Sequence, residues 1–241
     1  MSTTELPAVD ILEALDPLAK RAGNGVRKRP GLFISFEGID GAGKSTQLKL
    51  LAARLREQGK SVLETAEPGG TSVGLQIRRI LLDTANPELS AMAEVLLLFA
   101  GRAQHVEEVI LPALDRGLIV LCDRFTDSTV AYQGGGRGLA IGTVMAIDRI
   151  ACDGLCPHLT LYLDIDVETA LDRARERNRE DDSPGTRIEA QTPEFHTRVR
   201  DAYLDLAATH RERIRLVDAL GSREDVAERI WGWVSRALAA R

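Results

Sequence analysis

The sequence predicts an α/β protein with a doubly wound, five-stranded parallel sheet flanked by helices. From residue 32 onward, short β-prone apolar runs alternate with longer segments of helical period, which is the pattern of consecutive strand–helix–strand units. Polar residues suited to binding follow directly after several of these runs, and ligands of such sheets bind beyond the carboxyl ends of the strands. We therefore expect the functional residues to meet along one edge of the sheet.

Apolar runs and periodicity define the expected elements in order. Strands are expected at 32–37, 61–66, 118–122, 159–165 and 213–218. Helices are expected at about 44–58, 71–83, 90–116, 140–153, 167–179, 193–211 and 222–240.

Two segments stand outside this alternation. Residues 1–30 contain a Gly-Asn-Gly sequence and end on a basic run before Pro30, so they are predicted to be a flexible N-terminal extension of a domain spanning 31–241. Residues 178–192 are polar and interrupted by a Pro-Gly pair, which favours a lid at about 173–192 that closes over a ligand.

Composition narrows the functional class. The net charge of −5 argues against nucleic-acid binding, which normally requires a basic domain. No apolar run approaches the roughly 18 residues of a membrane span, and the N-terminus has no signal-peptide pattern. Three cysteines form neither a disulfide framework nor a zinc motif. We therefore expect a cytoplasmic protein without nucleic-acid or membrane partners.

The strongest motif follows the first strand and reads Gly38-x-x-x-x-Gly43-Lys44-Ser45. Glycines let the backbone approach phosphate oxygens, and the loop N–H groups and the following helix N-terminus attract anions. Lys44 would add a charge between the β- and γ-phosphates, and Ser45 would offer a hydroxyl to Mg²⁺. The motif predicts a P-loop NTPase that binds ATP through Gly38, Ile39, Asp40, Gly41, Ala42, Gly43, Lys44, Ser45 and Thr46.

An Asp-Arg pair follows directly after the third predicted strand. Asp123 is expected to hold Mg²⁺ together with Ser45, directly or through water, and Arg124 can bind a phosphate with its guanidinium fork. The alternative is that the two residues cap the following helix or pair with each other.

Arginines crowd into the predicted lid. Phosphoryl transfer spreads negative charge over the equatorial oxygens, and arginines that close over it can accelerate the reaction by about 10³–10⁵. We assign Arg177 and Arg187 to catalysis and Arg173 to ATP binding. For Arg175 and Arg179, a solvated helix face with acidic neighbours is at least as good a reading.

Several further motifs together resemble thymidylate kinase of bacterial type. The resemblance covers about 32–240 and is carried by Phe36-Glu-Gly-x-Asp-Gly-x-Gly-Lys-Ser-Thr46, Glu67-Pro-Gly-Gly-Thr71, Asp123-Arg-Phe125 and Asp127-Ser-Thr-x-Ala-Tyr-Gln-Gly-Gly-Gly-Arg-Gly138. The last block is the most specific. The resemblance implies a nucleoside monophosphate kinase fold, a reaction that moves the γ-phosphoryl of ATP to dTMP with Mg²⁺, and a homodimer.

The same resemblance implies roles for individual residues. Arg124 would contact the monophosphate and act in catalysis with Lys44, and Arg102 would reach the thymine edge. Tyr132 would close against the sugar, where a ribose 2′-hydroxyl would project. The implied substrate-binding set is Asp40, Glu67, Leu98, Arg102, Arg124, Ser128, Thr129, Tyr132 and Gln133.

Three positions bear on how closely this sequence follows the residue pattern of the thymidylate kinases that it resembles. Gly41 leaves the phosphate loop without an arginine, so the catalytic arginine should come from the lid, as in bacterial relatives. Ala66 stands where most relatives have an arginine before Glu-Pro-Gly-Gly, and Leu98 stands where they have an aromatic that stacks on thymine. A kinase for another (deoxy)nucleoside monophosphate, and a protein that binds ATP without turnover, therefore remain alternatives.

Overall fold

The computed structural model describes residues 29–180 and 185–240. Its sheet has five parallel strands in the order β2-β3-β1-β4-β5, which confirms the predicted fold class. The strands are β1 (Leu32–Glu37), β2 (Val62–Ala66), β3 (Ile119–Asp123), β4 (Leu159–Asp164) and β5 (Ile214–Asp218). Most of the predicted extension, residues 1–28, lies outside the described residues, as does the 181–184 part of the lid.

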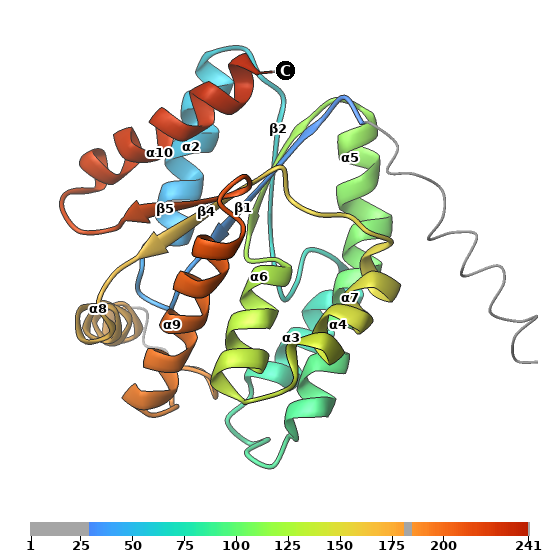
Figure 1. Ribbon diagram of the computed structural model, residues 1–241, viewed down its shortest axis with the longest axis vertical. Coiled ribbons are helices and arrows are strands. Elements are labelled where there is room, and N and C mark those ends of the chain that lie inside the picture. The colour runs from blue at the N-terminus through green and yellow to red at the C-terminus, as the bar shows by residue number, and fades with distance from the viewer. Residues whose placement is uncertain (1–28, 181–184, 241) are drawn as a thin grey trace, which may run out of the picture.

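Helices cover both faces of the sheet (Figure 1). They are α2 (Lys44–Glu57), α3 (Ser72–Leu82), α4 (Ala91–His105), α5 (Leu111–Asp115), α6 (Thr126–Thr129), α7 (Ile141–Cys152), α8 (Val167–Glu180), α9 (Pro193–Thr209) and α10 (Arg223–Ala239). No helix within the described ranges is both long and apolar enough to cross a membrane.

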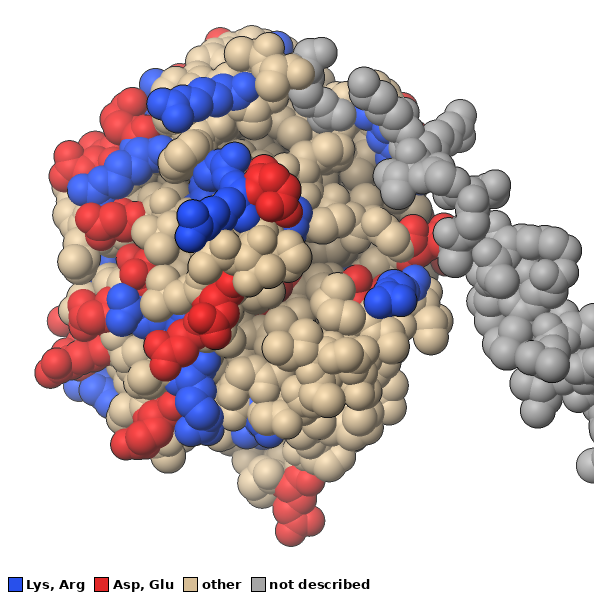
Figure 2. Space-filling view, viewed as in Figure 1, with Lys and Arg blue, Asp and Glu red and all other residues tan. Residues whose placement is uncertain are grey.

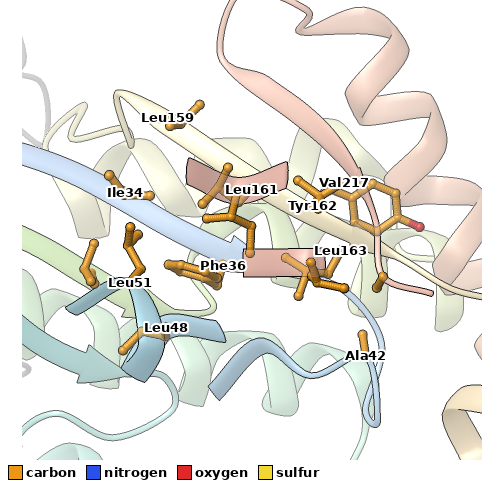
Figure 3. Close-up of a cluster of buried hydrophobic side chains, with 14 of the residues drawn as sticks. Ile34, Phe36, Ala42, Leu48, Leu51, Leu159, Leu161, Tyr162, Leu163 and Val217 are labelled. Atoms are coloured by element: carbon orange, nitrogen blue, oxygen red, sulfur yellow. The ribbon is translucent and has the colours of Figure 1, made fainter. Parts of the chain in front are cut away.

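Strand alternation divides the core into two apolar clusters. Ile34 and Phe36 of β1 point to one face, where Figure 3 shows them with Leu48 and Leu51 of α2. Phe33 points to the opposite face, into a cluster supplied by α4, α5 and α7. Because the central strands β1, β3 and β4 are buried on both faces, we expect ligands to bind at the strand ends, where the loops open.

The long helix predicted at 90–116 is present but changes its hydrogen-bond pattern. Between α4 and α5 it passes through a π-helical stretch, η1 (Val106–Ile110). The predicted helices leave out α6 and the π-helical stretch that continues it, η2 (Val130–Gly136). The specific motif block therefore lies on a helix.

Close packing explains the glycines of η2. A Cβ on Gly135 would lie 2.5 Å from Ala202 Cβ, and one on Gly136 would lie 2.6 Å from the Phe195 ring. Both neighbours belong to α9, so these glycines allow two helices to approach closely instead of forming a turn. The approach brings Tyr132 and Gln133 to the edge of the sheet beside β1 and β3.

Candidate functional site

A cleft of about 1100 Å³ opens at the carboxyl ends of the strands. Every predicted site residue except Gly38 and Ile39 lines it. The structure thus brings together residues from the phosphate loop, the strand ends, α4, η2 and the lid, whose individual roles stay predictions.

The phosphate loop joins β1 to α2 with the backbone that its glycines allow. Gly38, Gly41 and Gly43 have φ of 137°, 85° and 91°. A Cβ at Gly41 would lie 1.9 Å from the carbonyl oxygen of Ala170, so α8 packs directly on the loop. Gly43 is the N-cap of α2 and supplies no side-chain cap, which leaves the first-turn N–H groups available to an anion.

Lys44 is buried at the centre of this loop. Its ammonium donates to the carbonyl oxygen of Ile39 at 2.9 Å and lies 4.0 Å from Asp40 Oδ1. Burial, helped by the nearby charge of Arg124, lowers the pKa of Lys44 to about 8. Phosphate oxygens placed in the loop would oppose that shift and hold the lysine charged.

Ser45 and Asp123 form an oxygen pair at the end of β3. The Ser45 hydroxyl donates to the Asp123 carboxylate, although the two residues are 78 positions apart. The β1–β3 register, which sets Phe36 opposite Asp123, produces this contact. A hydroxyl and a carboxylate are hard oxygen ligands, so the pair fits Mg²⁺.

Arg124 connects the phosphate loop to the rest of the cleft. Its guanidinium donates to the carbonyl oxygen of Gly38 at 3.0 Å, to Asp40 Oδ1 at 2.7 Å and to the Tyr132 hydroxyl at 3.1 Å. Its backbone φ is 73°, an unusual value for a non-glycine residue that suits a functional constraint. Burial alone would raise the pKa of Asp40, but Arg124 and Lys44 hold it well below its ordinary value.

Sequence reasoning did not single out Glu37, which anchors the residues around Arg124. Its buried carboxyl accepts hydrogen bonds from Phe125 N at 2.8 Å, Ser128 Oγ at 2.5 Å and the Tyr203 hydroxyl at 3.1 Å. Burial, with the charge of Asp127, raises the pKa of Glu37 to about 8. The sequence feature that could have identified Glu37 is an acidic residue at the end of a mostly apolar strand.

On the other side of the cleft, Arg102 is held by a buried ion pair. Its Nε donates to Glu67 Oε2 at 2.6 Å and its Nη2 to Thr129 Oγ1 at 3.0 Å. His105 Nδ1 lies 2.8 Å from the second oxygen of Glu67. Of these four residues, Arg102, Glu67 and Thr129 were predicted to bind substrate, whereas His105 was not assigned to the site and is fully buried.

The two divergent positions also lie at the cleft. Leu98 lines it, while Phe99 is 2% exposed in the core, with the Arg102 guanidinium carbon 4.8 Å from its ring centroid. Ala66 lines the cleft as well, and Arg78 reaches the neighbouring loop by donating to the carbonyl oxygen of Pro68 at 2.9 Å.

The predicted lid arginines do not share one location. Arg173 donates to the carbonyl oxygen of Ala219 at 3.4 Å, and Arg177 pairs with Glu189 at 2.5 Å. Arg187 is buried instead against Glu94 of α4, another residue that the sequence reasoning missed. Glu94 is surrounded by apolar residues in the first half of α4, and this isolated acidic residue could have drawn attention to it.

Comparison with known proteins identifies the family. A sequence model described as thymidylate kinase matches residues 36–230. The thymidylate kinase of Syntrophotalea carbinolica is 51% identical over 207 residues, which are 86% of this chain and 96% of that protein. That of Pelobacter propionicus is 50% identical over 201 residues, 83% of this chain and 92% of the relative. The crystal structure of thymidylate kinase from Ehrlichia chaffeensis superposes with a TM-score of 0.68 at 31% identity, covering 85% of this chain and 98% of that one. The chain therefore belongs to the thymidylate kinase family.

Proposed function

We propose that this chain transfers the γ-phosphoryl of ATP to dTMP, giving ADP and dTDP. The observation that carries the proposal is the arrangement of the cleft. A phosphate loop with Lys44 and an oxygen pair lies on one side, a buried polar pocket with Arg102 lies on the other, and Arg124 contacts the loop between them. Two phosphorylated ligands can thus meet with their phosphates at Arg124.

The chemistry requires positioning more than a catalytic base. An oxygen of the dTMP phosphate is already anionic, so it attacks the γ-phosphorus directly while the bond to the β–γ bridging oxygen breaks and ADP leaves. Lys44 and Arg124 place positive charge beside the transferring group. Ser45 and Asp123 would hold Mg²⁺, which supplies further charge neutralisation when bound.

The lid would add further arginines to the site when it closes over the bound nucleotides. Arg177 is half exposed, lines the cleft and is the proposed catalytic arginine, with Arg173 beside the ATP phosphates. Arg187 was predicted to be catalytic too, but here it is ion-paired with Glu94, so that role requires the pair to open when both nucleotides are bound.

A coupled assay of ADP release with ATP, Mg²⁺ and a panel of monophosphates tests the proposal. dTMP should be turned over far better than dCMP, dGMP or AMP. A best rate with AMP or dCMP would support the kinase for another monophosphate instead. If the protein binds ATP but releases no ADP in the presence of any of the monophosphates, it is a protein that binds ATP without turnover.

The proposal includes a homodimer in the cytoplasm. Helices α4 and α7 pack together and expose Met92, Leu96, Ile141 and Ile150, the last at 78%. Figure 2 shows few charges over this part of the visible face, whereas both signs are intermingled over α8 to α10. Exposed apolar side chains on adjacent helices suit a self-complementary contact.

Light scattering after size-exclusion chromatography tests this state. Ile150→Arg should shift the chain from dimer to monomer. Leu216→Arg, at another exposed apolar side chain, should leave the dimer intact. A monomeric wild-type chain would reject the homodimer.

A further inference from the structure

The buried carboxylate of Glu94, which lines the cleft, contacts three polar side chains. Gln133 Nε2 donates to Glu94 Oε1 at 2.7 Å, and Arg137 Nη2 lies 3.3 Å from Glu94 Oε2. Arg187 Nη2 donates to the same oxygen. Glu94 is only 1% exposed, so these contacts replace water around its charge.

The charge state of Glu94 fixes the direction of the Gln133 amide. Burial alone would raise the pKa of Glu94, but the hydrogen bonds from Gln133 and Arg187 and the charge of Arg137 hold it below its ordinary value. An ionised carboxylate accepts hydrogen bonds and donates none. The NH₂ group of Gln133 must therefore face Glu94, and its carbonyl oxygen must face the other way.

That carbonyl oxygen points to the cleft. Gln133 is 4% exposed and lines the cleft. Its Oε1 receives no hydrogen bond from the described residues, and it does not belong to the described atoms that are both buried and unpartnered. A ligand in the cleft would thus meet a hydrogen-bond acceptor at Gln133 and, at Arg102, a guanidinium that can only donate.

Pyrimidine bases differ in the complementary groups. Thymine and uracil carry an N3–H donor beside the O4 acceptor, whereas cytosine carries an N3 acceptor beside a 4-amino donor. An acceptor at Gln133 and a donor at Arg102 in the same cleft match the first pattern and oppose the second at both positions. A buried polar group left unpaired is penalised strongly enough to discriminate between substrates.

We propose that Glu94 is a positioning residue that orients the Gln133 amide and thereby selects acceptors whose base carries N3–H. The inference rests on the proposed dTMP kinase function. Arg137 Nη2 lies beside Glu94, and Arg137 Nη1 donates to Gln191 Oε1 at 3.0 Å, so Arg137 keeps a positive charge next to Glu94 even when the Arg187–Glu94 pair opens. The Gln133 amide oriented by Glu94 should discriminate against dCMP but not against dUMP, since uracil presents the same two groups as thymine.

Glu94→Gln tests the proposal because a neutral amide can accept or donate and so releases the orientation of Gln133. We would measure kcat/KM for dTMP, dUMP and dCMP with ATP and Mg²⁺. The dTMP/dCMP ratio should fall by about tenfold or more, with the KM for dTMP rising more than kcat falls. The dTMP/dUMP ratio should stay within about twofold. An equal loss for all three acceptors would overturn the proposal, because it would mean that Glu94 only neutralises two arginines.

A matched control and two further variants complete the experiment. Glu108 accepts from Gln104 Nε2 at 2.9 Å on the surface, so Glu108→Gln repeats the change away from the cleft and should leave all ratios unchanged. In a Gln133→Leu background, Glu94→Gln should narrow the dTMP/dCMP ratio no further. If Glu94→Gln does not fold, Glu94→Asp keeps the charge but withdraws it from Gln133, and an unchanged ratio in that variant would overturn the proposal. A wild-type enzyme without preference for dTMP would reject the proposed function itself, independently of any variant.

Discussion

The phosphate loop and the buried polar pocket around Arg102, here called the acceptor pocket, share one cleft but are built in different ways. The loop consists of consecutive residues whose function depends on backbone shape, with positive φ at Gly38, Gly41 and Gly43. The pocket consists of buried charged side chains from distant segments, such as Glu67 with Arg102 and Glu94 with Arg187. Changes in the loop should therefore affect catalysis and spare folding, whereas changes in the pocket should affect both.

The largest effect should come from breaking the Glu67–Arg102 pair. Glu67→Gln would leave the buried Arg102 without its counter-charge, which typically lowers the free energy of unfolding by about 3–5 kcal/mol. Urea denaturation followed by circular dichroism measures the loss. Glu64→Gln, which removes the exposed partner of Arg56, should change stability by no more than about 1 kcal/mol. Equal effects of the two variants would contradict the distinction between pocket and surface.

Lys44→Ala, in the phosphate loop, should lower activity strongly and stability hardly at all. Removing its charge from the transferring phosphate should lower kcat by about 10²–10³. The urea midpoint should hardly move, because Asp40 keeps its ion pair with Arg124. Lys49→Ala, at an exposed position of the same helix, should change neither quantity. A large loss of stability in Lys44→Ala would show that the loop depends on side-chain charge as the pocket does.

The lid arginines differ in their surroundings, so their substitutions should have different effects on kcat and on stability. Arg177→Ala should lower kcat by about 10²-fold while ATP binding barely changes, because the arginine acts only when the lid has closed. Arg179 does not line the cleft, so Arg179→Ala should do little. Arg187→Ala should destabilise the fold in addition to any loss of kcat, owing to its pair with Glu94. If all three variants keep kcat within about twofold, the lid is only a cover.

Glu37 should make the free energy of unfolding depend on pH. Its folded-state pKa of about 8 exceeds the ordinary value of 4.5, so between these two values the unfolded chain binds fewer protons than the folded chain. Its contribution is thus favourable in acid and declines as the pH rises, by about 2 kcal/mol from pH 5 to 7. Subtracting the stability profile of Glu37→Gln from that of the wild type isolates the slope. A difference that does not change with pH would mean that Glu37 is ionised in the folded chain.

The same contrast explains what could be predicted from the sequence. The phosphate loop, Asp123 and the strand ends were predictable because local residue order determines a backbone shape and the ends of parallel strands meet. The helical state of 126–136 was not, because a glycine run normally interrupts a helix, and only its packing against Ala202 and Phe195 explains it. The Glu94–Arg187 pair was not either, since it joins residues 93 positions apart.

The smallest expected effect concerns the apolar wall of the acceptor pocket. Leu98 lines the cleft, while Phe99 is turned into the core beneath Arg102, so no aromatic ring from this part of α4 is available to stack on a base. Leu98→Phe should add that contact and lower the KM for dTMP by several-fold, corresponding to about 1 kcal/mol. Leu50→Phe, at an exposed position of α2, serves as the control and should leave the KM unchanged. Because kcat depends on the phosphate side of the cleft, it should stay nearly constant in both variants. A higher KM in Leu98→Phe would mean that the space beside Leu98 is already filled by the bound base, and that the pocket achieves its fit by shape rather than by stacking.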